Sequence, residues 1–188
     1  MHLYLIRHPQ PEVAHDSCYG QSDVAANQAH CEQVLPALSA RLPAGIPIIS
    51  SPLQRCSVLA QRLAAATHSA TPVLDARLME MNFGAWELRR WDDIPRAEVD
   101  AWAQDTLHYR PGGGENVLAM AARVLAFLHD MAGSRQGEAA LVCHAGPIRL
   151  IQAYRPGMAA AALAAQAALS RHDIPFGGCI SWDFPATI

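Results

Sequence analysis

The chain has 188 residues, of which 51% are hydrophobic and 16% charged, a composition typical of a globular protein with a substantial core. Its formal net charge of -3 provides no basic surface for nucleic acid, which we therefore exclude as a partner. All 14 basic residues are arginines, and the absence of lysine excludes P-loops, Schiff bases and other lysine chemistry.

The first predicted element is a strand over Leu3–Ile6, which is followed by Arg7, His8 and Pro9. Short apolar runs that end in proline or glycine are typical of buried strands in a parallel sheet, and ligands bind beyond the carboxyl ends of such strands. Arg7 also interrupts the run where a signal peptide would continue, and no later run reaches membrane-spanning length. We therefore expect a cytoplasmic protein with no membrane partner, and a ligand site at Arg7 and His8.

Two helices are predicted on either side of the next strand. The helices cover Gln28–Leu42 and Gln54–Ala66, and the strand between them covers Ile46–Ile49. Ser51 is placed to cap the second helix, with a proline after it at the first helical position. Arg55 then falls in the first helical turn, where free backbone N–H groups and the helix dipole favour an anion.

The middle of the chain has the least regular pattern. Residues 87–114 lie among three tryptophans and contain a run of three glycines, which favours an irregular segment that could serve as a lid. Glu80 and Glu87 are candidates for a general acid, the group that protonates a leaving alkoxide.

The second half of the chain alternates helices with strands. A strand over Ala139–Cys143 is followed by His144, just as the first strand is followed by His8. The other predicted elements are helices over Val117–Met131, from Gly146 through Ile151 and over Ala159–Leu169, and a strand over Cys179–Phe184. This alternation predicts the α/β class, as a three-layer α/β/α sandwich with a mostly parallel central sheet, in one domain over residues 1–188.

Three strand ends would bring cations and imidazoles to one edge of this sheet: Arg7 with His8, then Arg55, then His144. Such a set suits phosphoryl transfer, in which a nucleophile attacks phosphorus while cationic donors hold its oxygens. These residues alone do not decide whether His8 or His144 is the nucleophile. We expect no cofactor and no metal, because no carboxylate or cysteine stands at zinc-ligand spacing beside either histidine.

Five motifs, in order and over almost the whole chain, resemble those of the histidine phosphatase superfamily. They are Arg7-His8, Ser51-Pro52-Leu53-Gln54-Arg55, Glu80 before Phe83-Gly84, Gly113-Gly114-Glu115 and His144-Ala145-Gly146. The resemblance implies that His8 is the nucleophile and forms a phosphohistidine, and that Glu80 acts as general acid and then as base toward water. It also implies that the phosphoryl group is bound by Arg7, Arg55 and His144.

Three further positions bear on this site. Gln21, in the loop after Gly20, is an additional candidate for binding the phosphate. Pro9 follows the proposed nucleophile where the family usually has glycine, and Leu88 follows Glu87 where glycine is also frequent. Proline removes one backbone donor and restricts His8, but neither change removes a charge, so we expect activity to survive.

A narrower resemblance concerns the loop near the N-terminus. Arg7-His8-Pro9-Gln10-Pro11, followed by Cys18 through Val24, is similar to the α-ribazole phosphatases, which act in assembling the nucleotide loop of cobalamin. The expected function is therefore a phosphomonoester hydrolase acting on a small phosphorylated metabolite, with α-ribazole 5′-phosphate as the favoured substrate. One alternative is an enzyme that transfers phosphoryl groups as phosphoglycerate mutases do. The other is a protein that binds a phosphorylated ligand without turnover, because Pro9 prevents catalysis.

Overall fold

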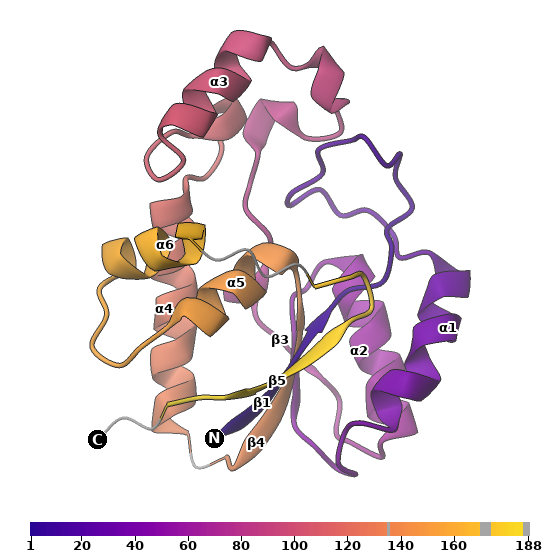
Figure 1. Ribbon diagram of the computed structural model, residues 1–188. Coiled ribbons are helices and arrows are strands. Elements are labelled where there is room, and N and C mark those ends of the chain that lie inside the picture. The colour runs from indigo at the N-terminus through magenta and orange to yellow at the C-terminus, as the bar shows by residue number, and fades with distance from the viewer. Residues whose placement is uncertain (135, 170–173, 186–188) are drawn as a thin grey trace.

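The computed structural model describes residues 1–134, 136–169 and 174–185, and its centre is a five-stranded sheet in the order β3-β2-β4-β1-β5 (Figure 1). The strands are β1 (His2–Arg7), β2 (Ile48–Ser50), β3 (Val73–Leu74), β4 (Glu138–Cys143) and β5 (Cys179–Asp183). β5 pairs antiparallel with β1, whereas the other three pairings are parallel. The mostly parallel sheet is thus confirmed. β3 was not predicted, because its two residues are exposed at a sheet edge and carry no buried apolar run.

Helices cover both faces of the sheet and complete the predicted three layers (Figure 1). They are α1 (Gln28–Ser39), α2 (Gln54–Ala66), α3 (Arg96–Gln104), α4 (Val117–Gly133), α5 (Ala145–Ala153) and α6 (Ala160–Leu169). α1 and α2 pack on one face, and α4, α5 and α6 pack on the other. Among the described helices, none combines the length and the apolar character needed to cross a membrane.

Side-chain alternation along the central strands builds the two cores. Leu3 and Leu5 of β1 are fully buried in the core on the α4 side, whereas Ile6 is fully buried in the core on the α2 side. β4 behaves likewise, with Leu141 facing α4 and Val142 facing α2. Because the central strands are covered on both faces, they read as continuous apolar runs, and their carboxyl ends meet at one edge of the sheet.

The region expected to be irregular contains one regular helix. α3 lies beyond the sheet edge, flanked by short 3-10 turns at residues 84–86, 91–93 and 111–113 (Figure 1). This region packs around a small core of its own, in which Trp86 is 1% exposed and contacts Cys18 and Ile94. Helix α3 escaped prediction because it is only nine residues long and none of its side chains is buried in a core.

Leu88 occupies the position at which glycine is frequent, and its backbone explains that preference. Its φ angle is +64°, in the left-handed region that costs an L-residue about 1 kcal/mol or more, and its side chain is 61% exposed. We therefore expect Leu88→Gly to raise the free energy of unfolding by about 1 kcal/mol, or Tm by about 3 °C. Thermal unfolding of both proteins measures this effect.

The matched control is Leu74→Gly, which replaces another exposed leucine, in the extended backbone of β3. Glycine relieves no strain in a strand, so this variant should be no more stable than the parent protein. Equal shifts in the two variants would contradict the strain assigned to Leu88.

Candidate active site

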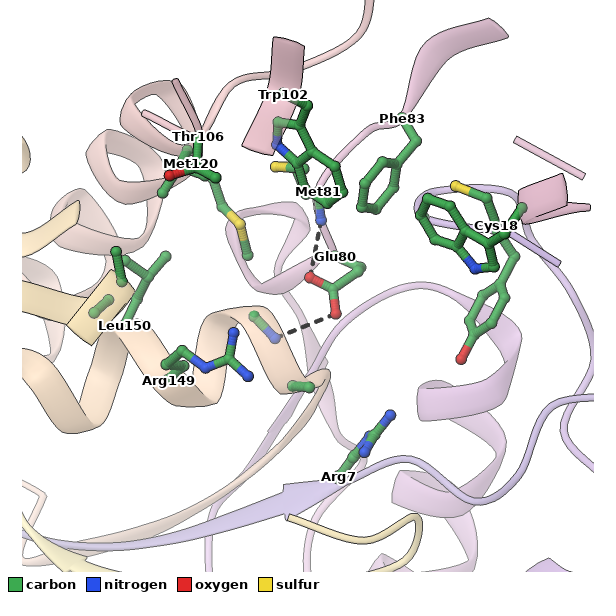
Figure 2. Close-up of a pocket in the computed structure, with 18 of the residues that line it drawn as sticks. Arg7, Cys18, Glu80, Met81, Phe83, Trp102, Thr106, Met120, Arg149 and Leu150 are labelled. Atoms are coloured by element: carbon green, nitrogen blue, oxygen red, sulfur yellow. Dashed lines mark hydrogen bonds between the residues drawn. The ribbon is translucent and has the colours of Figure 1, made fainter. Parts of the chain in front are cut away.

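A cavity of about 520 Å³ opens at the carboxyl ends of the parallel strands (Figure 2). Arg7 and His8 reach it from the end of β1, and Glu80 reaches it from the segment before α3. Further lining comes from residues 15–20, from aromatic side chains of residues 83–102 and from one face each of α4, α5 and α6. This volume is ample for a small phosphorylated metabolite.

His8 is held at the floor of the cavity in one orientation. Its backbone N–H donates to the carbonyl of Cys143 (3.0 Å), which ties the end of β1 to the end of β4. Its ring Nδ1 lies 2.6 Å from the Pro9 carbonyl oxygen, and only a protonated Nδ1 can donate to that acceptor. Burial and, to a smaller extent, the nearby charge of Arg55 lower the pKa of His8 to about 3. At neutral pH the imidazole is therefore uncharged, and Nε2 carries the free lone pair.

Arg55 is fully buried beside this imidazole. Nη1 donates to the carbonyl of Ser22 (2.8 Å) and Nη2 to the carbonyl of Gly20 (2.5 Å), so the guanidinium is fixed by the loop that follows β1. The Nε–H is also buried, and no described residue accepts a hydrogen bond from it. Arg55 is not among the described residues that line the cavity, so its charge acts on the His8 imidazole from inside the protein.

Arg7 contributes a guanidinium to the cavity lining. Its Nη1 donates to the carbonyl of Ile174 (2.6 Å), and its Cζ lies 3.9 Å from the ring centroid of Phe176. Phe176 also contacts the His8 ring, at a centroid distance of 5.3 Å. Ile174 and Phe176, which precede β5, thus orient the side chains of Arg7 and His8.

His144 lies behind His8, with the two ring centroids 5.0 Å apart. The ring is fully buried, and its Nε2 lies 2.9 Å from the Ser51 hydroxyl and 3.4 Å from Cys56 Sγ. Burial lowers the pKa of His144 well below its usual value, and the neighbouring His8 and Arg55 act in the same direction. Both imidazoles are therefore neutral around pH 7.

The prediction that Ser51 caps the second helix is wrong. α2 begins after Leu53, and the exposed carboxylate of Asp23 accepts from the Gln54 backbone N–H (2.7 Å) in place of a local cap. The Ser51 hydroxyl is instead directed to His144. The loop after β1 therefore supplies the cap, and the serine is free to orient an imidazole.

Glu80 presents its carboxylate to the cavity from a fixed position (Figure 2). Oε1 accepts from the Met81 backbone N–H (3.0 Å), and Oε2 accepts from the Gly146 backbone N–H (3.2 Å) at the start of α5. A Cβ atom on Gly146 would lie only 2.2 Å from Oε1 of Glu80. The glycine after His144 is thus required for the carboxylate to approach the helix.

An arginine on α4 holds the backbone beneath Glu80, and the sequence analysis missed it. Arg123 pairs with both carboxylate oxygens of Glu115, at 2.8 Å each. Its remaining donors reach the backbone carbonyls of Arg77, Met79 and Glu80. The sequence signal that could have identified Arg123 is its position as a lone arginine among the apolar residues of the predicted helix. Its pairing with Glu115 gives the glutamate of the Gly113-Gly114-Glu115 motif a structural role.

The remaining carboxylate and amide candidates lie away from the cavity lining. The Gln21 side chain donates to the Glu80 carbonyl (3.0 Å) and accepts from Asn82 (3.3 Å), and Gln21 is not among the described residues that line the cavity. The Glu87 carboxylate accepts from the backbone N–H groups of Gln21, Ser22 and Phe83. Glu87 therefore fastens two loops together, which leaves Glu80 as the carboxylate at the cavity.

Aromatic side chains form the outer wall of the cavity. Trp91 and Trp102 stack with nearly parallel rings, at an interplanar angle of 5°, and the Phe83 ring meets both edge-on. All three side chains line the cavity, so the region proposed as a lid supplies part of its wall. Within the described part of the chain, no cluster of three or more metal-ligating side chains is found.

Comparisons with known proteins agree with this geometry. The family model for the histidine phosphatase superfamily (branch 1) matches residues 3–174. The adenosylcobalamin/alpha-ribazole phosphatase of Escherichia coli K12 is 28% identical over 176 residues, which cover 87% of this chain and 83% of that protein.

Solved structures give the same result. The alpha-ribazole phosphatase from Shigella flexneri is 25% identical with a TM-score of 0.80, over 97% of this chain and 90% of that one. A mycobacterial glucosyl-3-phosphoglycerate phosphatase has a TM-score of 0.75 at 24% identity, over 96% of this chain and 88% of that one, and shares the fold.

Proposed function

The chain belongs to the histidine phosphatase superfamily and is a phosphatase, and from this premise we propose that it hydrolyses phosphate monoesters through a phosphohistidine formed on His8. One observation carries the proposal. The hydrogen bond to the Pro9 carbonyl keeps the His8 proton on Nδ1, and burial keeps the ring neutral, so Nε2 is a nucleophile at neutral pH. The cavity lies directly in front of this ring.

In the first step, His8 Nε2 attacks phosphorus, the N–P bond forms and the bond from phosphorus to the leaving oxygen breaks. Arg7, which lines the cavity, holds the phosphoryl oxygens, the buried Arg55 adds positive charge beside His8, and His144 supports the His8 ring from behind. Protonated Glu80 gives its proton to the leaving oxygen, so the product leaves as a neutral alcohol.

In the second step, water attacks the phosphohistidine. The Glu80 carboxylate accepts a proton from the water as the new P–O bond forms, and the N–P bond breaks. Inorganic phosphate leaves, His8 regains its neutral lone pair and Glu80 is protonated again. Both steps use the same glutamate, which the N–H groups of Met81 and Gly146 hold at the cavity.

Pro9 is compatible with this chemistry. The Nδ1 proton of His8 needs only a carbonyl oxygen at position 9, and proline supplies that oxygen as well as glycine does. The missing N–H of proline therefore leaves the nucleophile intact, which favours an active enzyme over a non-catalytic phospholigand-binding protein.

For the substrate, we propose α-ribazole 5′-phosphate or a closely related ester. Its alcohol portion is a ribose that carries a flat aromatic base, and the outer wall of the cavity offers the rings of Phe83, Trp91 and Trp102. The alpha-ribazole phosphatases among the similar proteins support the same choice.

Phosphate release from α-ribazole 5′-phosphate, p-nitrophenyl phosphate and 3-phosphoglycerate, measured with EDTA present, tests this proposal. We expect the ribazole ester to be hydrolysed with a kcat/KM at least about tenfold above the other two. Equal rates on all three esters would contradict the substrate assignment. Isomerisation of 3-phosphoglycerate without phosphate release would instead indicate a mutase.

A further inference from the structure

Arg149 places a second guanidinium in the cavity lining, on the helix face that holds Glu80. Four residues of α5 line the cavity, namely Ala145, Gly146, Arg149 and Leu150, and this spacing defines one face of a helix. Gly146 donates to the Glu80 carboxylate, and Arg149 follows almost one turn later, about 4.5 Å along the helix axis. Arg149 therefore lies beside the position that the alcohol portion of a substrate occupies beyond Glu80.

The donors of Arg149 differ from those of the buried Arg55 in being unused by the described residues. Its side chain is exposed to the cavity and makes no hydrogen bond or ion pair with any residue that the structure describes. By contrast, Arg55 donates to two backbone carbonyls. Arg149 therefore has all five N–H groups available to a ligand.

The wall opposite Arg149 is aromatic. Figure 2 shows the Arg149 guanidinium directed into the cavity, with Phe83 and Trp102 on the far side of Glu80. Apolar contact from Leu150 and Met120 continues the wall on the helical side. A group that extends from the leaving oxygen thus passes between a forked hydrogen-bond donor and a set of flat rings.

We infer that Arg149 selects the alcohol portion of the substrate, by donating hydrogen bonds to oxygen atoms on a sugar that links the phosphoryl group to an aromatic ring. This inference rests on the proposed function and deepens it. Arg149 remains in place through both steps and takes no part in the bonds that break or form. It acts as a specificity-determining residue, so its loss should affect sugar esters and spare simple ones.

The test compares Arg149→Met with the parent enzyme on three esters: α-ribazole 5′-phosphate, ribose 5-phosphate and phenyl phosphate. Methionine keeps much of the length and removes the donors. Losing a hydrogen bond from a charged donor to a neutral acceptor should lower kcat/KM of Arg149→Met about 10- to 100-fold on both ribose esters. The loss should come mainly from a higher KM. Phenyl phosphate, which has no sugar oxygen, should change by about twofold or less.

Arg96→Met is the matched control. Arg96 is exposed on α3, outside the cavity lining, and pairs with Asp100, so its loss should leave all three rates unchanged. Equal losses on all three esters in Arg149→Met would overturn the inference, because Arg149 would then act on the phosphoryl group. Unchanged rates would overturn it as well.

The proposed function and this inference fail in different ways. If the parent enzyme hydrolyses none of the three esters, the proposed function fails. If it hydrolyses phenyl phosphate, and Arg149→Met hydrolyses the ribose esters at the parent rate, only the role of Arg149 fails. Circular dichroism of the variant confirms folding, which a side chain without described partners should not affect.

Discussion

Replacing His8 with alanine is expected to lower kcat for phosphate ester hydrolysis by at least about 10⁴-fold, because it removes the nucleophile to which phosphorus is transferred. The second histidine at the strand ends is not placed to take over this role. His144 is fully buried and its Nε2 is occupied by Ser51 and Cys56, whereas His8 lines the cavity. Acid-sensitive labelling of the enzyme by a ³²P-labelled substrate should be present in the parent protein and absent from His8→Ala.

His129→Ala is the matched control for this loss. His129 is exposed on α4, outside the cavity lining, and its replacement should leave both turnover and labelling unchanged. Retained labelling in His8→Ala would mean that another residue accepts the phosphoryl group, and the proposed mechanism would then be wrong.

The second large effect is expected from Gly146→Ala, a change of one methyl group that adds no charge. The new Cβ would lie 2.2 Å from Oε1 of Glu80 and 2.6 Å from Cε of Met120, so the carboxylate must move. A displacement of about 1 Å at a catalytic group costs on the order of 10²-fold in rate. We therefore expect kcat for an alkyl phosphate to fall by about 100-fold.

The choice of substrate makes this prediction specific to the general acid. p-Nitrophenolate leaves without needing a proton, so p-nitrophenyl phosphate should lose much less activity than an alkyl ester. Gly133→Ala serves as control, because a Cβ at that position in α4 meets no atom within 4 Å. Equal losses on both esters would place the damage in phosphate binding rather than in proton transfer.

Residues that follow short apolar runs were the predictable part of this site. Arg7 ends β1, and His8 and His144 directly follow β1 and β4. The parallel pairing of these two strands brings all three residues to one edge of the sheet. The strands themselves were found because burial on both faces makes them uniformly apolar. Position along the chain was therefore enough to place these residues together.

Contacts between distant segments could not be predicted from the sequence. The pairing of Ser51 with His144, and of Arg123 with the carbonyls before Glu80, joins residues more than forty positions apart. Sequence spacing carries no record of such contacts, and Ser51 had a local alternative as a helix cap. The residues alone left Glu80 and Glu87 as equal candidates, and the family resemblance favoured Glu80, because their hydrogen-bond partners, which distinguish them, lie in distant segments.

The contact between His8 and the carbonyl of Pro9 has a consequence for the diversity of related enzymes. Because the acceptor is a peptide oxygen, which every amino acid provides, position 9 is free to vary so long as the peptide keeps its orientation. This hydrogen bond therefore does not require glycine at position 9. A sequence search that requires glycine after the histidine would miss chains that keep this hydrogen bond with another residue at position 9.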